Sequence, residues 1–176
     1  MKNTWLLLSF FTGVIIMMFV MAETGTSLKT AATPHGILDL EFAYNTTKVN
    51  AVIRAWDWKP YNSIDKNSIA RVNTYFDFIF LFFYAGFLFL ACKRIIQNIK
   101  GPFAMAGNII AIAALFAGFF DVLENIGMLL SLHGHISGSI AFFTTFFSVI
   151  KWVLAGIAVL YVLTGALIIG YRNIKF

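Results

Sequence analysis

Long apolar runs separated by short polar connections make up most of this chain. Four runs approach or exceed the roughly 20 residues that a membrane-spanning helix needs, and they cover about residues 5–21, 75–92, 104–132 and 140–171. The last run is long enough to tilt strongly or to begin outside the bilayer. The pattern predicts an all-α, polytopic membrane protein, a four-transmembrane-helix bundle that forms a single membrane domain over residues 1–176.

A longer polar stretch, residues 22–73, separates the first two apolar runs. Between residues 37 and 56, apolar side chains recur at helical spacing. We expect an amphipathic outer helix there, or a helix interrupted near Asn45, which lies on the bilayer surface or caps the bundle. Its inward face comprises Leu38, Phe42, Val52 and Trp56.

Aromatic and capping residues follow that outer helix and lead into the second span. The aromatic residues suit the membrane interface, where amphipathic rings settle: Trp56, Trp58 and Tyr61. Ser63 and Asp65 are typical of the start of a helix. We expect one of them to begin the helix that becomes the second span.

The composition agrees with a membrane location. Hydrophobic residues make up 60% of the chain and charged residues 12%, against roughly 45–50% and 25% in soluble domains. These values exclude a soluble globular domain and a disordered chain. A nucleic-acid-binding module is excluded as well, because the basic residues are scattered along the chain. The single cysteine, Cys92, excludes an internal disulfide and a cysteine-based metal cluster.

Basic residues predict the orientation of the spans. Lys93, Arg94 and Lys100 crowd the connection between the second and third spans, whereas the next connection contains no lysine or arginine. Further basic residues precede the first span and follow the last: Lys2, Arg172 and Lys175. By the positive-inside rule, both termini lie in the cytoplasm, residues 22–73 lie outside, and the protein is multi-pass in the inner (cytoplasmic) membrane. Alternatively, the first span is a secretory signal cleaved after Ala22.

Charged side chains also occur inside the predicted spans: Asp77, Asp121, Glu124 and Lys151. Each costs about 2.5–3.5 kcal/mol in mid-bilayer, so they must be paired, protonated, hydrated or close to the interface. Reflecting each hairpin through its turn places positions 77, 121 and 151 at nearly one depth, in the outer half of the membrane. Tyr84 and Asn125 share the faces of these acids. We therefore expect a polar core among the second, third and fourth spans.

This polar core has two interpretations. In the structural one, Lys151 pairs with Asp121, Asp77 bonds to a neighbouring hydroxyl or amide, and the network only fixes helix packing. In the functional one, the core binds a ligand, an ion or a proton. Three carboxylates against one lysine leave excess negative charge in a low-dielectric site, which a cation, a proton, Arg54 or Arg71 must offset. The candidate ligand-binding residues are Asp77, Asp121, Glu124, Asn125, Lys151, Tyr84, Asp39, Glu41 and Trp56.

Acids and histidines outside the spans are further candidates. Asp39 and Glu41 lie on a solvated face or, because apolar residues interleave with them, close enough to reach the polar core. His35, His133 and His135 would form a zinc site with one of these acids, although loop histidines are commonly just solvated. We expect no bound metal and no cofactor.

Several short motifs are similar to those of a group of small bacterial integral membrane proteins with four helices: Thr33-Pro34, Leu38-Asp39-Leu40-Glu41, Trp56, Asp77-Phe78 and Phe120-Asp121-Val122-Leu123-Glu124-Asn125. The resemblance covers most of the chain. It implies a retained first span and an inner-membrane location. No activity and no site are carried over from it.

Three functions remain as hypotheses. The first is a buried carboxylate and lysine site that opens to the extracytoplasmic side and binds a small ligand, a lipid headgroup or a cation. The alternatives are a membrane-embedded lipid-modifying enzyme, with Asp121 and Glu124 as acid and base, and a proton- or cation-coupled transporter. Expected partners are membrane lipids, a small hydrophobic ligand or cation, and a second copy of the chain, but no nucleic acid.

Overall fold

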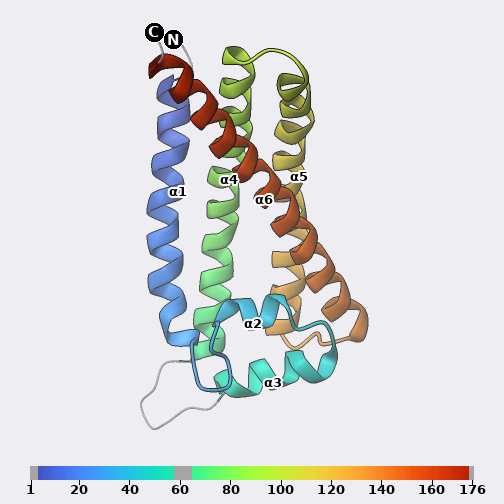
Figure 1. The fold of residues 1–176 in the computed structure, drawn as a ribbon. Helices are drawn as coiled ribbons and strands as arrows, with labels where there is room; N and C mark the ends of the chain where they lie inside the picture. The colour runs from blue at the N-terminus through green and yellow to red at the C-terminus, as the bar shows by residue number, and fades with distance from the viewer. Residues whose placement is uncertain (1–3, 58–64, 175–176) are drawn as a thin grey trace.

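The computed structural model describes residues 4–57 and 65–174, and its described residues contain helices but no strand. The predictions that rest on Lys2, Trp58, Tyr61, Ser63 and Lys175 lie outside the described residues. The elements are α1 (Thr4–Gly25), a short 3₁₀ turn η1 (Thr26–Leu28), α2 (Ile37–Glu41), α3 (Thr46–Asp57), α4 (Lys66–Asn98), α5 (Pro102–Leu132) and α6 (Gly138–Ile174) (Figure 1). The all-α fold class is therefore confirmed.

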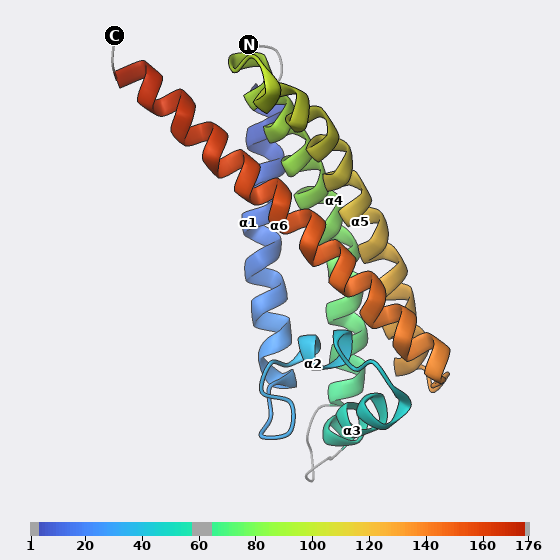
Figure 2. The ribbon, with the colours of Figure 1, turned by 45° about the vertical axis from the view of Figure 1, so that its right-hand side comes forward.

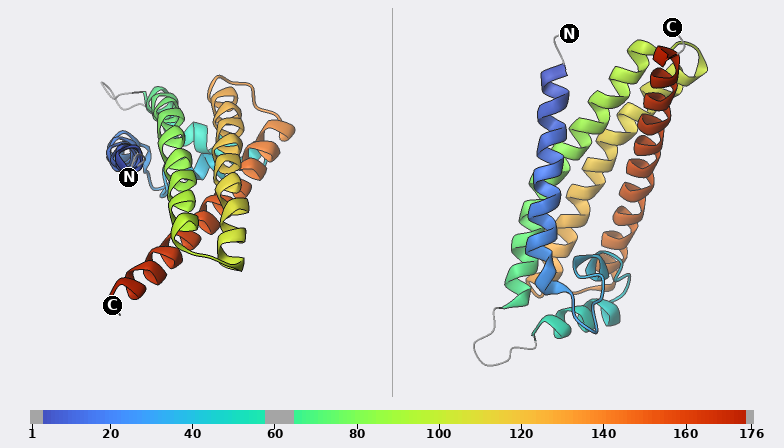
Figure 3. Two further views of the ribbon diagram at one scale, coloured as in Figure 1. Left: turned by 90° about the horizontal axis from the view of Figure 1, so that it is seen from above. Right: turned by 60° about the vertical axis from the view of Figure 1, so that its left-hand side comes forward.

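Four helical segments are long and apolar enough to span a membrane: Thr4–Leu28, Lys66–Asn98, Pro102–Leu132 and Gly138–Arg172. The start of α1, the end of α6 and the α4–α5 connection lie at one end of the bundle (Figure 1). Helices α2 and α3, which we call the cap, cover the opposite end of the bundle, the cap end. Figure 2 and Figure 3 show that α6 crosses the bundle obliquely, so that its first half lies beside α5 and its last turns project outward. The chain is a multi-pass membrane protein.

Helix α4 begins nine residues before the apolar run that predicted it. Asp65 is the N-cap, and its side chain accepts a hydrogen bond from the Asn67 backbone N–H at 3.2 Å. An acid at this position satisfies one of the unpaired amides of the first helical turn. The start signal that we expected at Asp65 is confirmed.

Small residues allow the spanning helices to approach closely. On α5, Ala114 and Gly118 are buried against α4, and a Cβ added at Gly118 would lie 2.8 Å from Ala85 Cβ. A Cβ at Gly127 would collide with Thr144 of α6. Such close contacts are the usual basis of helix association in bilayers, where apolar side chains gain little from leaving lipid.

Among the long helices, α4 is the one that α1 contacts extensively in the described residues. A Cβ at Gly13 would meet the ring of Phe83, and one at Gly86 would meet Phe10. Near the cap end, Asn73 Nδ2 donates to the Met21 carbonyl at 3.1 Å. These contacts describe how α1 sits against the bundle, and its retention in the mature protein stays a prediction.

The outer segment contains two helices, as in the interrupted form that we expected near Asn45. Its core includes Val49, Val52 and Trp56, which are buried. Leu38 is only half-buried, and the prediction for Phe42 is wrong because 41% of this residue is exposed. Phe42 follows the last residue of α2, so the helical period no longer applies there.

Candidate functional site

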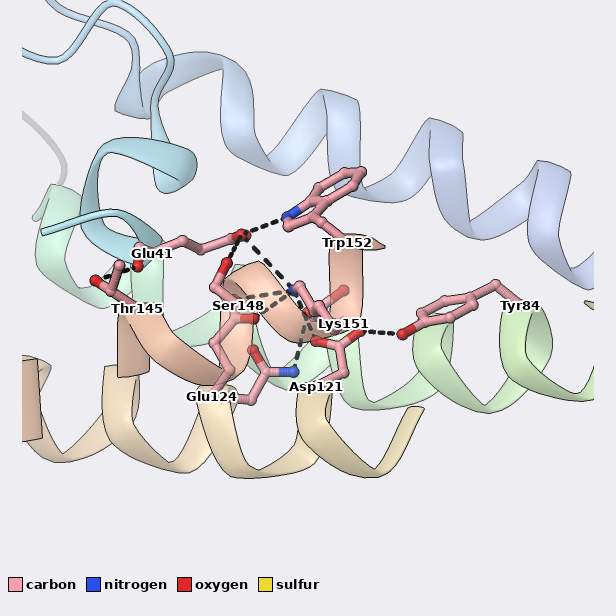
Figure 4. A network of polar contacts seen from close by, with 10 residues as sticks. Glu41, Tyr84, Asp121, Glu124, Thr145, Ser148, Lys151 and Trp152 are labelled. Atoms are coloured by element: carbon pink, nitrogen blue, oxygen red, sulfur yellow. Dashed lines mark hydrogen bonds and ion pairs between the residues drawn. The ribbon is translucent and has the colours of Figure 1, made fainter. Parts of the chain in front are cut away.

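Lys151, in the first half of α6, is the centre of a network of charged side chains (Figure 4). Its ammonium nitrogen donates to Asp121 Oδ1 at 2.8 Å and to Glu124 Oε1 at 2.9 Å. The other Glu124 carboxylate oxygen lies 2.8 Å from the same nitrogen. Only 8% of the Lys151 side chain is exposed. Two acids from α5 thus share one buried ammonium group.

Glu41, the last residue of α2, brings a third carboxylate to this network. Its Oε2 lies 3.7 Å from Lys151 Nζ. The same oxygen accepts hydrogen bonds from Ser148 Oγ at 3.2 Å and from Trp152 Nε1 at 3.3 Å. Thr145 Oγ1 donates to the Glu41 carbonyl at 2.9 Å. Figure 4 shows the partners of Glu41 along one stretch of α6. This stretch therefore holds α2 against the bundle.

Helix α4 adds an acid and a phenol. Asn125 Nδ2, from α5, donates to Asp77 Oδ2 at 2.9 Å, and Tyr84 OH donates to Asp121 Oδ2 at 2.7 Å. Asp77 is thus connected to the site through an amide, while Asp121 binds both the Lys151 ammonium and the Tyr84 hydroxyl. We call Glu41, Asp77, Asp121, Glu124 and Lys151 the charge cluster.

The charge cluster holds four carboxyl groups and one ammonium group, so it carries excess negative charge if all its acids ionise. The two arginines that we considered as counter-charges lie elsewhere. Arg54 is exposed on α3, while Arg71 donates to Ser68 Oγ at 2.7 Å and to the Leu132 carbonyl at 3.3 Å. Among the described residues, neither arginine takes part in the charge cluster.

One buried acceptor at this site, Asn125 Oδ1, has no hydrogen-bond donor among the described residues, and Asn125 has no solvent-accessible surface. Glu124 Oε2 makes no separate hydrogen bond, but the Lys151 ammonium lies 2.8 Å from it. A buried acceptor without a donor is destabilising, so the site favours an added group that donates protons or carries positive charge.

Tyr84 and Asn125 bind members of the charge cluster, whereas two other predicted site residues, Asp39 and Trp56, bind elsewhere. The Asp39 carboxylate accepts from the His35 backbone N–H at 2.8 Å and pairs with His35 Nδ1 at 3.2 Å. Trp56 Nε1 donates to the Leu28 carbonyl at 3.0 Å and to Thr33 Oγ1 at 3.2 Å. Trp56 is therefore an anchor of the cap, and only Glu41 of the two outer acids reaches the polar core.

The histidines do not assemble the zinc site that we considered. His133 and His135 are exposed in the α5–α6 connection, whereas His35 pairs with Asp39. Within residues 4–57 and 65–174, no group of three or more histidine, cysteine, aspartate or glutamate side chains is placed to hold a metal ion.

Two polar residues of the site, Thr145 and Trp152, escaped the sequence analysis. They lie three residues before and four residues after Ser148 on α6, and Trp152 directly follows Lys151. That spacing places them on one helical face. A tryptophan within a span is typical of a lipid-facing residue. The hydrogen bond from Trp152 to Glu41 could therefore not be predicted without the position of α2.

Two cavities lie near the cap end, away from the charge cluster. One, of about 370 Å³, lies between the end of α1 and the start of α4, beside Thr24 and Ser68. The other, of about 520 Å³, lies between α2 and α3, beside Asp39 and Lys48. Neither is lined by a residue of the charge cluster.

Comparison with known proteins gives no relative: no protein-family model, no curated protein and no solved structure matches this chain.

Proposed function

We propose that this integral membrane protein binds a small cationic ligand at the charge cluster. The observation that carries the proposal is the imbalance of four buried carboxyl groups against one ammonium, with Arg54 and Arg71 engaged elsewhere or exposed. A low-dielectric site does not hold that excess negative charge unaided. Intramembrane acids in general mark sites for ions, protons or ligands.

The free hydrogen-bonding capacity supports the same class of ligand. Asn125 Oδ1 is an acceptor without a donor among the described residues, and a carboxylate or phosphate ligand would bring only more acceptors. An anionic headgroup is therefore a poor match. A protonated amine or an added proton satisfies this atom and reduces the excess charge at once.

The orientation that we propose follows from the basic residues. Lys93, Arg94, Lys100 and Arg172 all belong to the end opposite the cap, which the positive-inside rule assigns to the cytoplasm. The charge cluster then lies toward the extracytoplasmic side of the inner membrane. Labelling of a cysteine placed at Asn98 tests this orientation: reagents that cannot cross the membrane should fail to label it in intact cells.

Thermal unfolding of the purified protein in mild detergent tests cation binding. We expect the melting temperature to rise when ethylammonium replaces a bulky, non-binding cation at constant ionic strength. Asp121→Asn should abolish the rise, whereas Asp39→Asn, the matched change outside the charge cluster, should preserve it. Equal melting temperatures in both salts and no cationic molecule in the mass spectrum of the purified protein would refute the proposal.

Proton-coupled transport is the second candidate, because one series of side chains connects the cap to the bundle interior. Glu41 lies beside Lys151, Lys151 binds Asp121, and Asp121 accepts from Tyr84. Buried residues beyond Tyr84 are apolar, beginning with Ala85 and Leu88, so the series covers one half of the bundle. Proton flux into proteoliposomes that Asp121→Asn abolishes would favour this candidate. The enzyme alternative stays a hypothesis without a supporting contact of its own.

A further inference from the structure

Trp152 contacts the charge cluster and is itself half-exposed. Its indole N–H donates to Glu41 Oε2, and its ring centre lies 5.8 Å from Lys151 Nζ. Yet 52% of Trp152 is exposed. The indole therefore contacts the charged groups while about half of its residue surface is left uncovered by the protein.

The side of the charge cluster toward the cap is covered more firmly. Leu40, directly before Glu41, and Ala43, two residues after it, are buried, and the Glu41 carbonyl is bound by Thr145. Opening this side requires a stretch of backbone to leave the bundle. On its other side, Glu41 Oε2 is bound by the half-exposed Trp152, and exposed side chains change rotamer within picoseconds to nanoseconds.

The outer face of α6 next to Trp152 suits an alkyl chain. Val149 and Val153 are exposed and apolar. One turn further from the cap, a Cβ added at Gly156 would meet nothing within 4 Å. This face therefore offers a smooth apolar surface that begins at the indole and continues toward the middle of the bilayer.

We propose that the charge cluster takes an amphiphile with an ammonium headgroup, which enters sideways from the bilayer past Trp152. This inference rests on the proposed cation site and names its ligand class. The headgroup takes the place of the indole N–H at Glu41 Oε2, and its alkyl chain lies along Val149, Val153 and Gly156. Glu41 is the carboxylate that accepts it, because it lies 3.7 Å from Lys151 Nζ while Asp121 and Glu124 lie at 2.8 Å.

The experiment uses the full chain in phosphatidylcholine nanodiscs with a dodecylammonium probe that carries a photoreactive diazirine on its chain. Mass spectrometry of the irradiated protein should locate the label on α6 near Val153. Unlabelled dodecylammonium should compete with the probe. Dodecanol, which lacks the charge, and ethylammonium, which lacks the chain, should compete at least tenfold less at equal concentration.

Substitutions connect the labelling to Glu41 and Trp152. A hydrogen bond to a charged group contributes roughly 1.5–3 kcal/mol, so Glu41→Gln should reduce labelling about tenfold or more. Glu23→Gln, which changes an exposed acid near the cap end, should leave it unchanged. Trp152→Phe removes the competing N–H but keeps an aromatic wall, and should preserve or increase labelling. A large loss in Trp152→Phe would contradict the displacement of the indole.

The outcomes separate this inference from the proposed cation site. If soluble cations raise the melting temperature but dodecylammonium leaves no competed label on α6, the site exists and fills from water, which overturns the inference alone. Equal competition by dodecanol would show an apolar groove without headgroup recognition and overturn it as well. If neither soluble cations nor dodecylammonium bind, both proposals are refuted. The competition experiments need only the wild-type chain, so they decide the question even if a variant fails to fold.

Discussion

Replacing Lys151 by methionine should destabilise the protein severely. Methionine retains a flexible apolar side chain of similar length, so the change removes mainly the ammonium group. Three carboxylates within 3.7 Å of that group would lose their counter-charge. Breaking a buried ion pair from one side costs about 3–5 kcal/mol, and we expect a loss in this range. Lys100→Met, at an exposed lysine of the α4–α5 connection, should change stability by less than about 0.5 kcal/mol.

Second substitutions reveal which acid depends on Lys151. Adding Asp121→Asn to Lys151→Met should recover part of the loss, because members of one network couple by about 0.5–3 kcal/mol. Glu124 lies as close to the ammonium as Asp121 does, at 2.8 Å. Adding Glu124→Gln as well should therefore recover more stability than Asp121→Asn alone.

Circular dichroism during titration of a mild detergent with dodecyl sulfate measures these differences. The wild type, Lys100→Met, Lys151→Met and the double and triple variants are compared at one protein concentration. If Lys151→Met unfolds at the wild-type midpoint, the ammonium is not held against the acids. Additive losses in the double variant would likewise refute the pairing with Asp121.

Three smaller changes probe the packing around the site. Trp56→Phe removes an indole N–H with two buried acceptors, so it should cost about 1–3 kcal/mol and speed amide exchange across α3. Gly118→Ala should cost about 1–3 kcal/mol because its Cβ would lie 2.8 Å from Ala85 Cβ, whereas Gly156→Ala, with open space around it, should not destabilise; detergent unfolding compares them. Leu40→Ala should cost about 2–5 kcal/mol and Phe42→Ala less than about 0.5 kcal/mol, since Leu40 is buried and Phe42 exposed; the same unfolding measurement decides.

The sequence allowed the meeting of three helices at Asp77, Asp121 and Lys151 to be predicted for an energetic reason. A charge inside an apolar run is conspicuous, because an unpaired one costs several kcal/mol in the bilayer. Short connections also fix the relative depth of neighbouring helices. The four spans, and the position of the basic α4–α5 connection at the same end of the bundle as the start of α1 and the end of α6, were predictable on the same grounds.

The cap was only partly predictable, because its position depends on contacts rather than on periodicity. The sequence does not distinguish Asp39 from Glu41: both are acids between apolar residues, two leucines for Asp39 and a leucine and a phenylalanine for Glu41. Their fates differ because α2 ends at Glu41 and faces Ser148 and Trp152 of α6, while Asp39 turns toward His35. The exposure of Phe42 has the same origin. No local pattern shows where a five-residue helix stops against a distant partner.

The energetics of buried charge bear on whether the cluster serves only to fix packing. Replacing a buried ion pair by well-packed apolar residues is often neutral or stabilising, by about 1–4 kcal/mol. A chain that needed only helix contacts in this layer would gain nothing from four acids and a lysine. Gly118 and Ala114 already supply close approach between α4 and α5 without charge.

Lys151 instead connects acids from α2 and α5. A ligand that competes for Glu41 therefore also weakens one of the contacts that hold the cap. Binding at this site and docking of α2 are therefore coupled through the Glu41 carboxylate, which is the physical basis on which a buried site in a closed bundle would respond to its ligand.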